Sequence, residues 1–236
     1  MTDAIHTLTN FAATAHCQGD VTLSLFLDVK CAFPSVIIPR LLHDMCLLGI
    51  PQEYTVWLQE KLTHRSTMIS FDDYESPPLA ITNGIDQGCP LSVILYLIYN
   101  SGLLHVAMDT TKELAVGFMD DITLVARAPS FPEAAQIITD MMYRSNGALK
   151  WSTTHCSVFE HDKAALLGTT RRRQPDPISP SRTIQLPRPT IQIEGHTIEP
   201  SATVKYLGVI IDEELQFNDH TTYTLAKGTK WILQVR

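Results

Sequence analysis

Few features of this sequence favour a disulfide scaffold or a secreted protein. Five cysteines, at positions 17, 31, 46, 89 and 156, are scattered, and no two of them have the Cys-x-x-Cys spacing. An odd number of scattered cysteines argues against a disulfide framework and against a zinc site. The N-terminal stretch MTDAIHTLTN has neither the basic start nor the apolar core of a secretory signal. The sequence therefore predicts an intracellular protein and leaves open the choice between nucleus and cytoplasm.

Long uninterrupted apolar runs are also lacking. The most apolar segment, PLSVILYLIYNSGLLHVAM at 90–108, is interrupted by Ser92, Asn100 and His105, and no basic flank follows it. A membrane span needs about 20 predominantly apolar residues and is commonly flanked by Lys or Arg. We expect a buried helix here and no membrane partner.

Positive charge is scarce over most of the chain. The net charge is −7, and residues 1–160 hold 8 Lys and Arg against 17 Asp and Glu. This balance argues against general nucleic-acid affinity. Residues 161–236 hold 10 Lys and Arg against 8 Asp and Glu, with a basic run at Arg171, Arg172 and Arg173. The run fits either a solvated linker or a local basic contact.

The composition and the distribution of prolines suggest that the chain has three segments. With 236 residues, 44% hydrophobic and 18% charged, the chain can bury one large core, with or without an appendage. Residues 171–190 contain five prolines, which predict a linker or loop. We therefore expect a mixed α/β body at 1–170 and a separate C-terminal segment at 191–236. The C-terminal segment should contain a short β-rich part followed by a helix near 219–236.

Hydrophobic patterns within the body indicate an α+β fold. LSLFLD at 23–28 is a continuous apolar run, typical of a central strand buried on both faces. A helix should follow Pro39 and stop at Gly49, and residues 131–148 have the pattern of an amphipathic helix. Residues 67–82 read as a hairpin with an acidic turn. This order predicts a central antiparallel sheet packed on helices.

The stretch GFMDDITLVA places two adjacent acids, Asp120 and Asp121, between apolar runs that read as paired strands. Two carboxylates about 5 Å apart repel by roughly 3 kcal/mol at an effective dielectric near 20. A surface turn in water would dissipate that repulsion, and a bound cation would remove it. Asp28 also closes a strand, so the three acids converge if their strands are neighbours. Hard cations such as Mg²⁺ prefer oxygen ligands of this kind and keep coordination sites for phosphates.

Four motifs now make a family resemblance specific. LFLDVKCAFPSV, NGIDQGCPLSVILYLIYN, GFMDDITLVA and KYLGVIID occur in this order. Their order and spacing resemble the palm motifs of reverse transcriptases, especially those of fungal non-LTR retrotransposons. The resemblance covers nearly the whole chain. It implies a polymerase palm with a short hairpin and helix at the C-terminal end.

The resemblance implies roles at the acids and near them. Asp28 and Asp120 would be the principal ligands of Mg²⁺, which Mn²⁺ can replace, and Asp121 would be the second acid of the pair. Phe33 would lie under the sugar and exclude a 2′-hydroxyl. Without the resemblance, the favoured interpretation of Phe33 is an ordinary core aromatic at the start of a helix.

Other matched positions would contact substrate, primer or product. Gln87 and Gly88 match a nucleotide-pocket loop, in which glycine lets backbone approach closely. Lys163 falls where the family has a lysine near the leaving pyrophosphate, although a solvated lysine fits as well. Tyr206, Leu207 and Gly208 resemble the hairpin that grips the primer end, and LAKGTKWILQVR resembles the opening helix of the thumb.

Departures from the pattern shape the functional expectation. Cys31 and Asp86 stand where many relatives have Gly, and Cys89 where they have a small or acidic residue. Only the last segment of the fingers, TDAIHTLT, matches, so fingers and thumb are expected to be truncated. The missing fingers, endonuclease or RNase H segments would then be partners within a larger polyprotein.

Three functions remain open from the sequence. The first is an RNA-directed DNA polymerase domain that is weakly active alone. It would use two metal ions, an RNA template, a DNA primer and dNTPs. The second is a catalytically silent folded relic. The third, a sheet-based RNA-binding module, lacks a visible pattern of exposed aromatic and basic strand residues.

Overall fold

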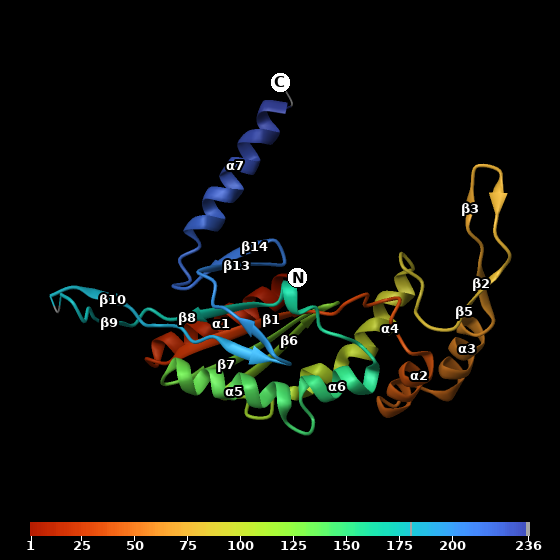
Figure 1. Ribbon diagram of the computed structural model, residues 1–236, viewed down its shortest axis with the longest axis horizontal. Helices are drawn as coiled ribbons and strands as arrows, with labels where there is room; N and C mark the ends of the chain where they lie inside the picture. The colour runs from red at the N-terminus through yellow and green to blue at the C-terminus, as the bar shows by residue number, and fades with distance from the viewer. Residues whose placement is uncertain (180, 235–236) are drawn as a thin grey trace.

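The computed structural model describes residues 1–179 and 181–234, and a four-stranded antiparallel sheet lies at its centre (Figure 1). The strand order is β6-β7-β1-β8, with β1 (Val21–Asp28), β6 (Glu113–Phe118), β7 (Asp121–Ala128) and β8 (Ala165–Thr169). β1 pairs along its whole length with β7 and also with β8. Its central position explains why both of its faces are buried. The predicted α+β fold is confirmed.

Helix α5 (Phe131–Tyr143) and the 3-10 helix η1 (Ser101–Val106) contact one face of the sheet. On this side α6 (Ala148–His155) packs on α5 and η1, α4 (Pro90–Asn100) adjoins η1, and α2 (Ile38–Leu47) packs on α4. Leu23, Leu25 and Leu27 of β1 join the core on this side. The predicted helices after Pro39, from Pro90 and from Phe131 are present, but the last ends at Tyr143 and not at 148. Within the apolar segment 90–108, α4 and η1 cover 90–106, and α4 is buried on one face only, since Ile94 and Leu97 are exposed. None of the helices in the described ranges is both long and apolar enough to cross a membrane.

A second, smaller core lies on the opposite face. It is covered by α1 (Thr2–Cys17) and by the hairpin of β13 (Thr203–Tyr206) and β14 (Val209–Asp212). Phe26, which alternates with the leucines of β1, packs here with Leu8 and Tyr206. The C-terminal hairpin is thereby fastened to the strand that ends at Asp28.

Several elements extend away from this body in Figure 1. On one side lie α3 (Gln52–Leu62) and the ribbons β2 (Arg65–Thr67) with β5 (Leu79–Ile81) and β3 (Ser70–Phe71) with β4 (Tyr74–Glu75). These ribbons form the predicted hairpin, and its turn contains Asp72 and Asp73. The helix α7 (Asn218–Gln234) rises from β14, and none of its side chains is buried. Residues 235–236 of the expected C-terminal helix lie outside the described residues.

The segment predicted as a linker or loop contains a ribbon of β9 (Arg173–Pro175) and β10 (Thr183–Gln185). The helix η2 (His161–Lys163) precedes it, and β11 (Ile191–Ile193) and β12 (His196–Ile198) follow. Arg172 donates to the carbonyl oxygens of Gly19 and Pro129, at 3.1 and 2.6 Å. Arg173 pairs with Glu214 at 2.9 Å. The basic run is therefore used to hold the ribbon against the chain's own body.

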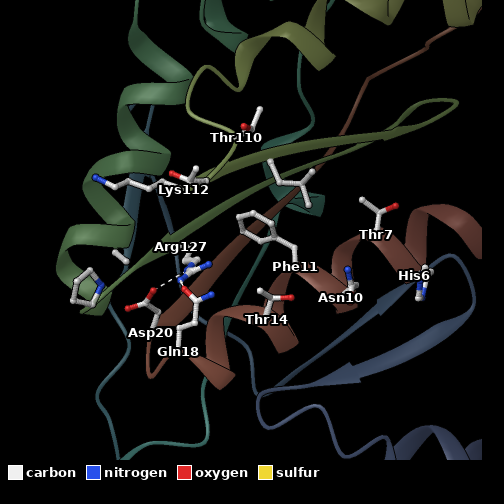
Figure 2. Close-up of a pocket in the computed structure, with 14 residues that line it drawn as sticks. His6, Thr7, Asn10, Phe11, Thr14, Gln18, Asp20, Thr110, Lys112 and Arg127 are labelled. Atoms are coloured by element: carbon white, nitrogen blue, oxygen red, sulfur yellow. Dashed lines mark hydrogen bonds and ion pairs between the residues drawn. The ribbon is translucent and has the colours of Figure 1, made fainter.

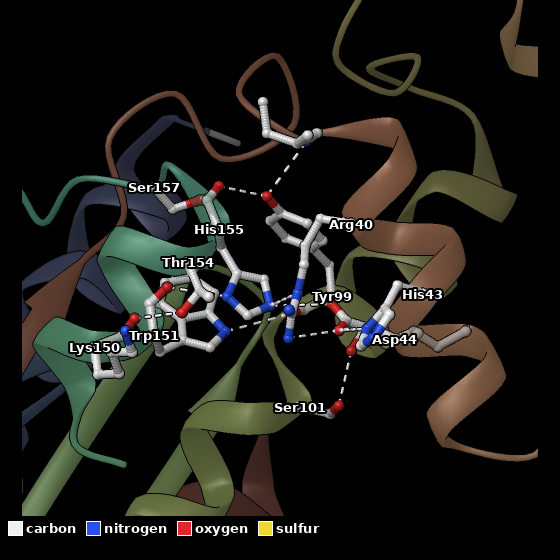
Figure 3. Close-up of polar contacts among 12 residues, drawn as sticks. Arg40, His43, Asp44, Tyr99, Ser101, Lys150, Trp151, Thr154, His155 and Ser157 are labelled. Atoms are coloured by element: carbon white, nitrogen blue, oxygen red, sulfur yellow. Dashed lines mark hydrogen bonds and ion pairs between the residues drawn. The ribbon is translucent and has the colours of Figure 1, made fainter. Parts of the chain in front are cut away.

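A buried ionic cluster ties α2 to α6 (Figure 3). The Asp44 carboxylate lies 2.9 Å from Arg40 Nη2 and 3.0 Å from His155 Nε2. The Tyr99 hydroxyl donates to the His155 carbonyl oxygen at 2.5 Å and accepts from Ile37 N–H at 3.3 Å. Burial lowers the pKa of His155, and Asp44 acts in the opposite direction. The cluster fixes the start of α2, just beyond the turn that carries Phe33.

Candidate active site

The strand register brings the three predicted acids to one end of the sheet. Asp28, the last residue of β1, lies directly opposite Asp121, the first residue of β7. Met119 and Asp120 form the two-residue turn between β6 and β7, since Phe118 pairs with Asp121. Met119 has a φ of +57°, and the Asn100 side chain donates to its carbonyl oxygen. The predicted convergence of Asp28, Asp120 and Asp121 at one end of the sheet is confirmed, although Asp121 belongs to β7 and only Asp120 lies in the turn.

Negative charge accumulates at this end of the sheet. Partial burial raises the pKa of Asp121, and repulsion from Asp120 and then Asp28 adds to the effect. Burial and the charge of Asp120 also raise the pKa of Tyr96. The Tyr96 hydroxyl is buried without a hydrogen-bond partner among the described residues. These shifts indicate a site that favours a positive charge between the strands.

Lys163 supplies one such charge. Its Nζ lies 2.9 Å from Asp28 Oδ2 and 2.7 Å from Glu160 Oε2. The Glu160 backbone N–H donates to the Asp28 carbonyl oxygen at 2.9 Å, which holds the two acids side by side. The structure thus places Lys163 at the predicted site, while its role toward pyrophosphate stays a prediction. Sequence reasoning missed Glu160, whose position three residues before Lys163 is the only local signal.

The donor set fits a hard divalent cation in its chemistry, although its side chains are not arranged around one. Three carboxylates on adjacent strand ends are the ligands that Mg²⁺ prefers. Within residues 1–179 and 181–234, no three His, Cys, Asp or Glu side chains are grouped so that they could hold a metal ion. Asp28 instead contacts Lys163.

The predicted primer-grip hairpin lies beside the acids. Tyr206 pairs with Val209 across a two-residue turn, in which Leu207 and Gly208 have φ of +47° and +84°. Positive φ at both turn positions is typical of a type I′ hairpin. A cleft of about 290 Å³ joins this hairpin to the acids; it is lined by Asp28, Asp121, Lys163, Lys205, Tyr206 and Leu207. Residues far apart in sequence thus share one cleft.

The Phe33 turn and the Gln87–Gly88 loop are fastened to each other. Ile85 N–H donates to the Phe33 carbonyl oxygen at 3.0 Å. The Phe33 ring stacks on Tyr96 with centroids 5.3 Å apart, so it is also a core aromatic. Gly88 has a φ of +90°, and no described atom lies within 4 Å of where its Cβ would be. Its backbone conformation is therefore the observed reason for glycine, whereas close backbone approach occurs at Gly84.

Asp86, which stands where many relatives have Gly, points toward a cation of the chain itself. Its Oδ1 lies 3.0 Å from Arg65 Nη1, and Arg65 Nη2 donates to the Gly84 carbonyl oxygen at 2.6 Å. Arg65 therefore offsets the extra negative charge beside the pocket. Cys31 has a φ of +51°, a conformation that glycine adopts without strain.

Replacing Gly84 with alanine is expected to destabilise the chain by about 2 kcal/mol, because of positive-φ strain and overpacking. Gly84 has a φ of +82°, and a Cβ would lie 2.8 Å from the Pro34 carbonyl oxygen. Gly88→Ala is the matched control, since it has a positive φ with open space and should cost less. Urea unfolding of both variants measures the difference. Equal losses would show that contact with Pro34 is unimportant.

A larger hollow, about 700 Å³, lies away from these residues (Figure 2). It runs between α1 and the ends of β6 and β7, and its lining includes Phe11, Lys112 and Arg127. Arg127 is held by Asp20 at 2.7 Å. None of the predicted site residues lines this hollow.

Comparisons with known proteins agree with the motif order. The family model "Reverse transcriptase (RNA-dependent DNA polymerase)" matches residues 2–211. The polymerase of the mobile element jockey from Drosophila melanogaster is 25% identical over 93% of this chain and 23% of its own length. The probable polymerase of the X-element from Drosophila melanogaster is 26% identical over 99% of this chain and 25% of its own. The chain thus spans about a quarter of the length of these relatives.

Solved structures support the fold. Apo telomerase from Candida tropicalis, truncated from its C-terminal domain, aligns with a TM-score of 0.59 at 12% identity, over 92% of this chain and 38% of its own. Telomerase from the same organism, in complex with a fragment of telomeric RNA, aligns with a TM-score of 0.60 at 12% identity, over 91% of this chain and 32% of its own. The four motifs, the register of the acids and the family match over most of the chain lead to one conclusion: this chain belongs to the reverse transcriptase family.

Proposed function

We propose that this chain is the palm of an RNA-directed DNA polymerase of a non-LTR retrotransposon. The observation that carries the proposal is the placement of Asp28 opposite Asp121, beside the Asp120 turn, in a chain related to retrotransposon polymerases. The reaction would be attack of a primer 3′-hydroxyl on the α-phosphate of a dNTP, with release of pyrophosphate. The partners would be an RNA template, a DNA primer and other segments of a longer polyprotein inside the cell.

Asp28, Asp120 and Asp121 would hold two divalent cations, Mg²⁺ or Mn²⁺. Such ions supply Lewis acidity for the hydroxyl and neutralise charge that develops on the phosphate. The remaining residues would position the reactants, which accounts for much of the rate in phosphoryl transfer. Phe33 would lie under the incoming sugar, and Gln87 with Gly88 would line the nucleotide pocket. Tyr206, Leu207 and Gly208 would hold the primer end over the cleft.

Lys163 fits one role in this scheme, contact with the leaving pyrophosphate. It lies on the cleft that contains Asp28 and Asp121, so its ammonium would reach a phosphate leaving from that cleft. Its pKa is raised first by Glu160 and then by Asp28, which keeps it protonated. A protonated lysine there would stabilise the leaving pyrophosphate.

A catalytically silent relic is the second candidate, and one observation favours it. Asp28 is already paired with Lys163, and the described carboxylates do not form a ready metal site. A chain that could not release this pair would keep the palm fold without the reaction. Extension by the wild type decides between the two candidates.

The test is extension of a DNA primer on an RNA template by the whole chain with Mn²⁺. We expect weak synthesis that requires both template and cation. Because residues 1–160 carry a negative balance, phosphate contacts are few and affinity for template and primer should be weak, so the assay is run at low salt. Absence of product even at low salt would contradict the polymerase proposal and support the relic. Product formed without template or without cation would also contradict it.

A further inference from the structure

We infer that Arg65 is a positioning residue of the nucleotide pocket, which holds the loop of residues 83–88 in place and offsets the charge of Asp86 within it. The inference rests on the proposed function, because Gln87 and Gly88 of this loop are the residues proposed to line the pocket. It assigns a task to an arginine that lies outside all four sequence motifs.

Every nitrogen of the Arg65 guanidinium donates to a partner on the chain. Nε donates to the Leu62 carbonyl oxygen at 3.1 Å, and Nη1 donates to Asp86 Oδ1 at 3.0 Å. Nη2 donates to the carbonyl oxygens of Gly84 and Asn83, at 2.6 and 3.3 Å. The planar guanidinium fixes the directions of these contacts together, which a lysine ammonium does not. One side chain thus joins the end of α3 to the loop.

The Arg65 side chain is mostly buried, whereas its ionic partner is not. Arg65 is 15% exposed and Asp86 is 52% exposed. An ion pair with so exposed a partner contributes little by itself, because water screens it. A guanidinium removed from water needs its backbone acceptors as well, since an unpaired buried donor is costly. We therefore expect the contacts to the loop carbonyls, more than the ion pair, to hold the loop.

The chain places Arg65 directly beside the start of the loop. His64, between α3 and β2, has a φ of +55°, so the backbone turns sharply before Arg65. Arg65 is the first residue of β2 and pairs with Ile81, the last residue of β5. In Figure 1 the loop then runs from β5 to the start of α4. The base of the ribbon and the loop therefore share one fixed point.

The turn that carries Phe33 holds the loop from the other side. Gly84 N–H donates to the Val36 carbonyl oxygen at 2.7 Å, while its own carbonyl oxygen accepts from Arg65. The Gly84 residue is thus bonded in both directions. Without Arg65, the Phe33 turn would hold the loop from one side only, and the exposed residues that follow Gly84 would lose their fixed position.

The charge of Asp86 gives Arg65 its second task. Asp86 directly precedes Gln87, so its carboxylate lies next to the pocket proposed for a triphosphate. An unpaired carboxylate there would repel the phosphates. Within residues 1–179 and 181–234, Arg65 is the one basic side chain in ion-pair contact with Asp86. Removing Arg65 should therefore weaken nucleotide binding through charge as well as through position.

The first measurement is hydrogen exchange of the loop amides, by mass spectrometry on the whole chain without nucleotide. Arg65→Met keeps much of the apolar stem and removes the donors, and it should speed exchange of the loop about 10-fold. Arg127→Met is the matched control, because Arg127 is 17% exposed and pairs with Asp20 at 2.7 Å, away from the loop. It should leave loop exchange unchanged. Melting curves confirm that each variant is folded.

The second measurement is the dNTP dependence of single-nucleotide incorporation on an RNA template. Arg65→Met should raise KM about 10-fold and lower kcat less, because binding is lost while the catalytic acids are unchanged. Asp86→Asn should lower KM in the Arg65→Met background and have little effect in the wild type, as a double-mutant cycle tests. Arg65→Lys keeps the charge, so its KM should stay closer to that of the wild type although its loop exchanges faster. A general loss of stability would produce none of these differences.

The outcomes that overturn the inference differ from those that overturn the proposed function. If the loop of folded Arg65→Met exchanges at the wild-type rate, Arg65 does not hold it. If the wild type incorporates nucleotide and Arg65→Met has the same KM, the positioning role is wrong and the proposed function stands. If Asp86→Asn does not lower KM in the Arg65→Met background, the charge role is wrong. If the wild type incorporates no nucleotide, the proposed function fails together with the pocket role of Arg65, and faster loop exchange in Arg65→Met would leave only its hold on the loop.

Discussion

Replacing Asp120 with asparagine is expected to reduce the rate of RNA-templated primer extension by about 100-fold or more. Loss of one group that stabilises charge in a transition state typically has an effect of this size. Asp120 lies in the two-residue turn between β6 and β7, next to the Asp28–Asp121 pair. An amide there is a weaker cation ligand than a carboxylate, while its shape is nearly unchanged. The loss should therefore appear in the rate and not in folding.

The stability of Asp120→Asn should equal or exceed that of the wild type without metal. Burial, Asp120 and Asp28 raise the pKa of Asp121. A carboxyl whose pKa is raised in the folded state favours folding below its unfolded pKa and disfavours it at neutral pH. Removing the Asp120 charge relieves part of that cost near pH 7. Added Mn²⁺ should raise the melting temperature of the wild type and not that of Asp120→Asn.

The measurement is single-nucleotide incorporation with Mn²⁺ at low salt, with protein in excess of primer. Asp162→Asn is the control for loss of an acid outside the β6–β7 turn, and it should retain activity. Extension by Asp120→Asn within a few-fold of the wild type would show that Asp120 is not needed for the reaction. That result would contradict the role proposed for Asp120 and leave the assignment of the chain to its family unchanged.

The hydrophobic pattern of the sequence was sufficient to predict the features that depend on a single strand or hairpin. The continuous apolar run of β1 predicted a central strand, because a strand with one solvent-exposed face would show alternating polar residues. The β6–β7 hairpin followed from two apolar runs too close together for any other connection, although its turn is Met119–Asp120 and Asp121 belongs to β7. Their convergence with Asp28 needed the added assumption that β1 and β7 are neighbours, which the register confirms.

Long-range ionic contacts could not be predicted in the same way. Lys163 meets Asp28 across 135 positions of sequence, and Arg65 meets Asp86 only after two ribbons have folded. Neither ion pair produces a periodic pattern in the sequence, because a charged surface residue has the same sequence context whether it is paired or solvated. The same holds for Arg172 and Arg173, whose proline-rich surroundings predicted a linker or loop.

The ionic cluster of Arg40, Asp44 and His155 also could not be predicted from the sequence. Its disruption has the largest expected effect on the stability of the chain. Asp44→Ala should reduce the free energy of unfolding by about 3 kcal/mol, the lower end of the range for breaking a buried ion pair. Asp44 accepts from Arg40 at 2.9 Å and lies 3.0 Å from His155. Its removal leaves the Arg40 guanidinium without its carboxylate. The lower end applies because the Arg40 side chain is 28% exposed, so water can replace the lost partner in part.

The measurement is urea unfolding at neutral pH, with Asp140→Ala in α5 as the control. Asp140 is also a helical aspartate with a side-chain partner, Gln136, but that contact is exposed, so its loss should be small. Replacing Arg40, Asp44 and His155 together with apolar residues of similar volume should cost less than Asp44→Ala alone, because no charge is then left unpaired. If Asp44→Ala proved no more damaging than Asp140→Ala, the cluster would not hold α2 against α6. The position of the Phe33 turn would then depend on the contacts of Gly84 and Ile85 with Val36 and Phe33, and on the stacking of Phe33 on Tyr96.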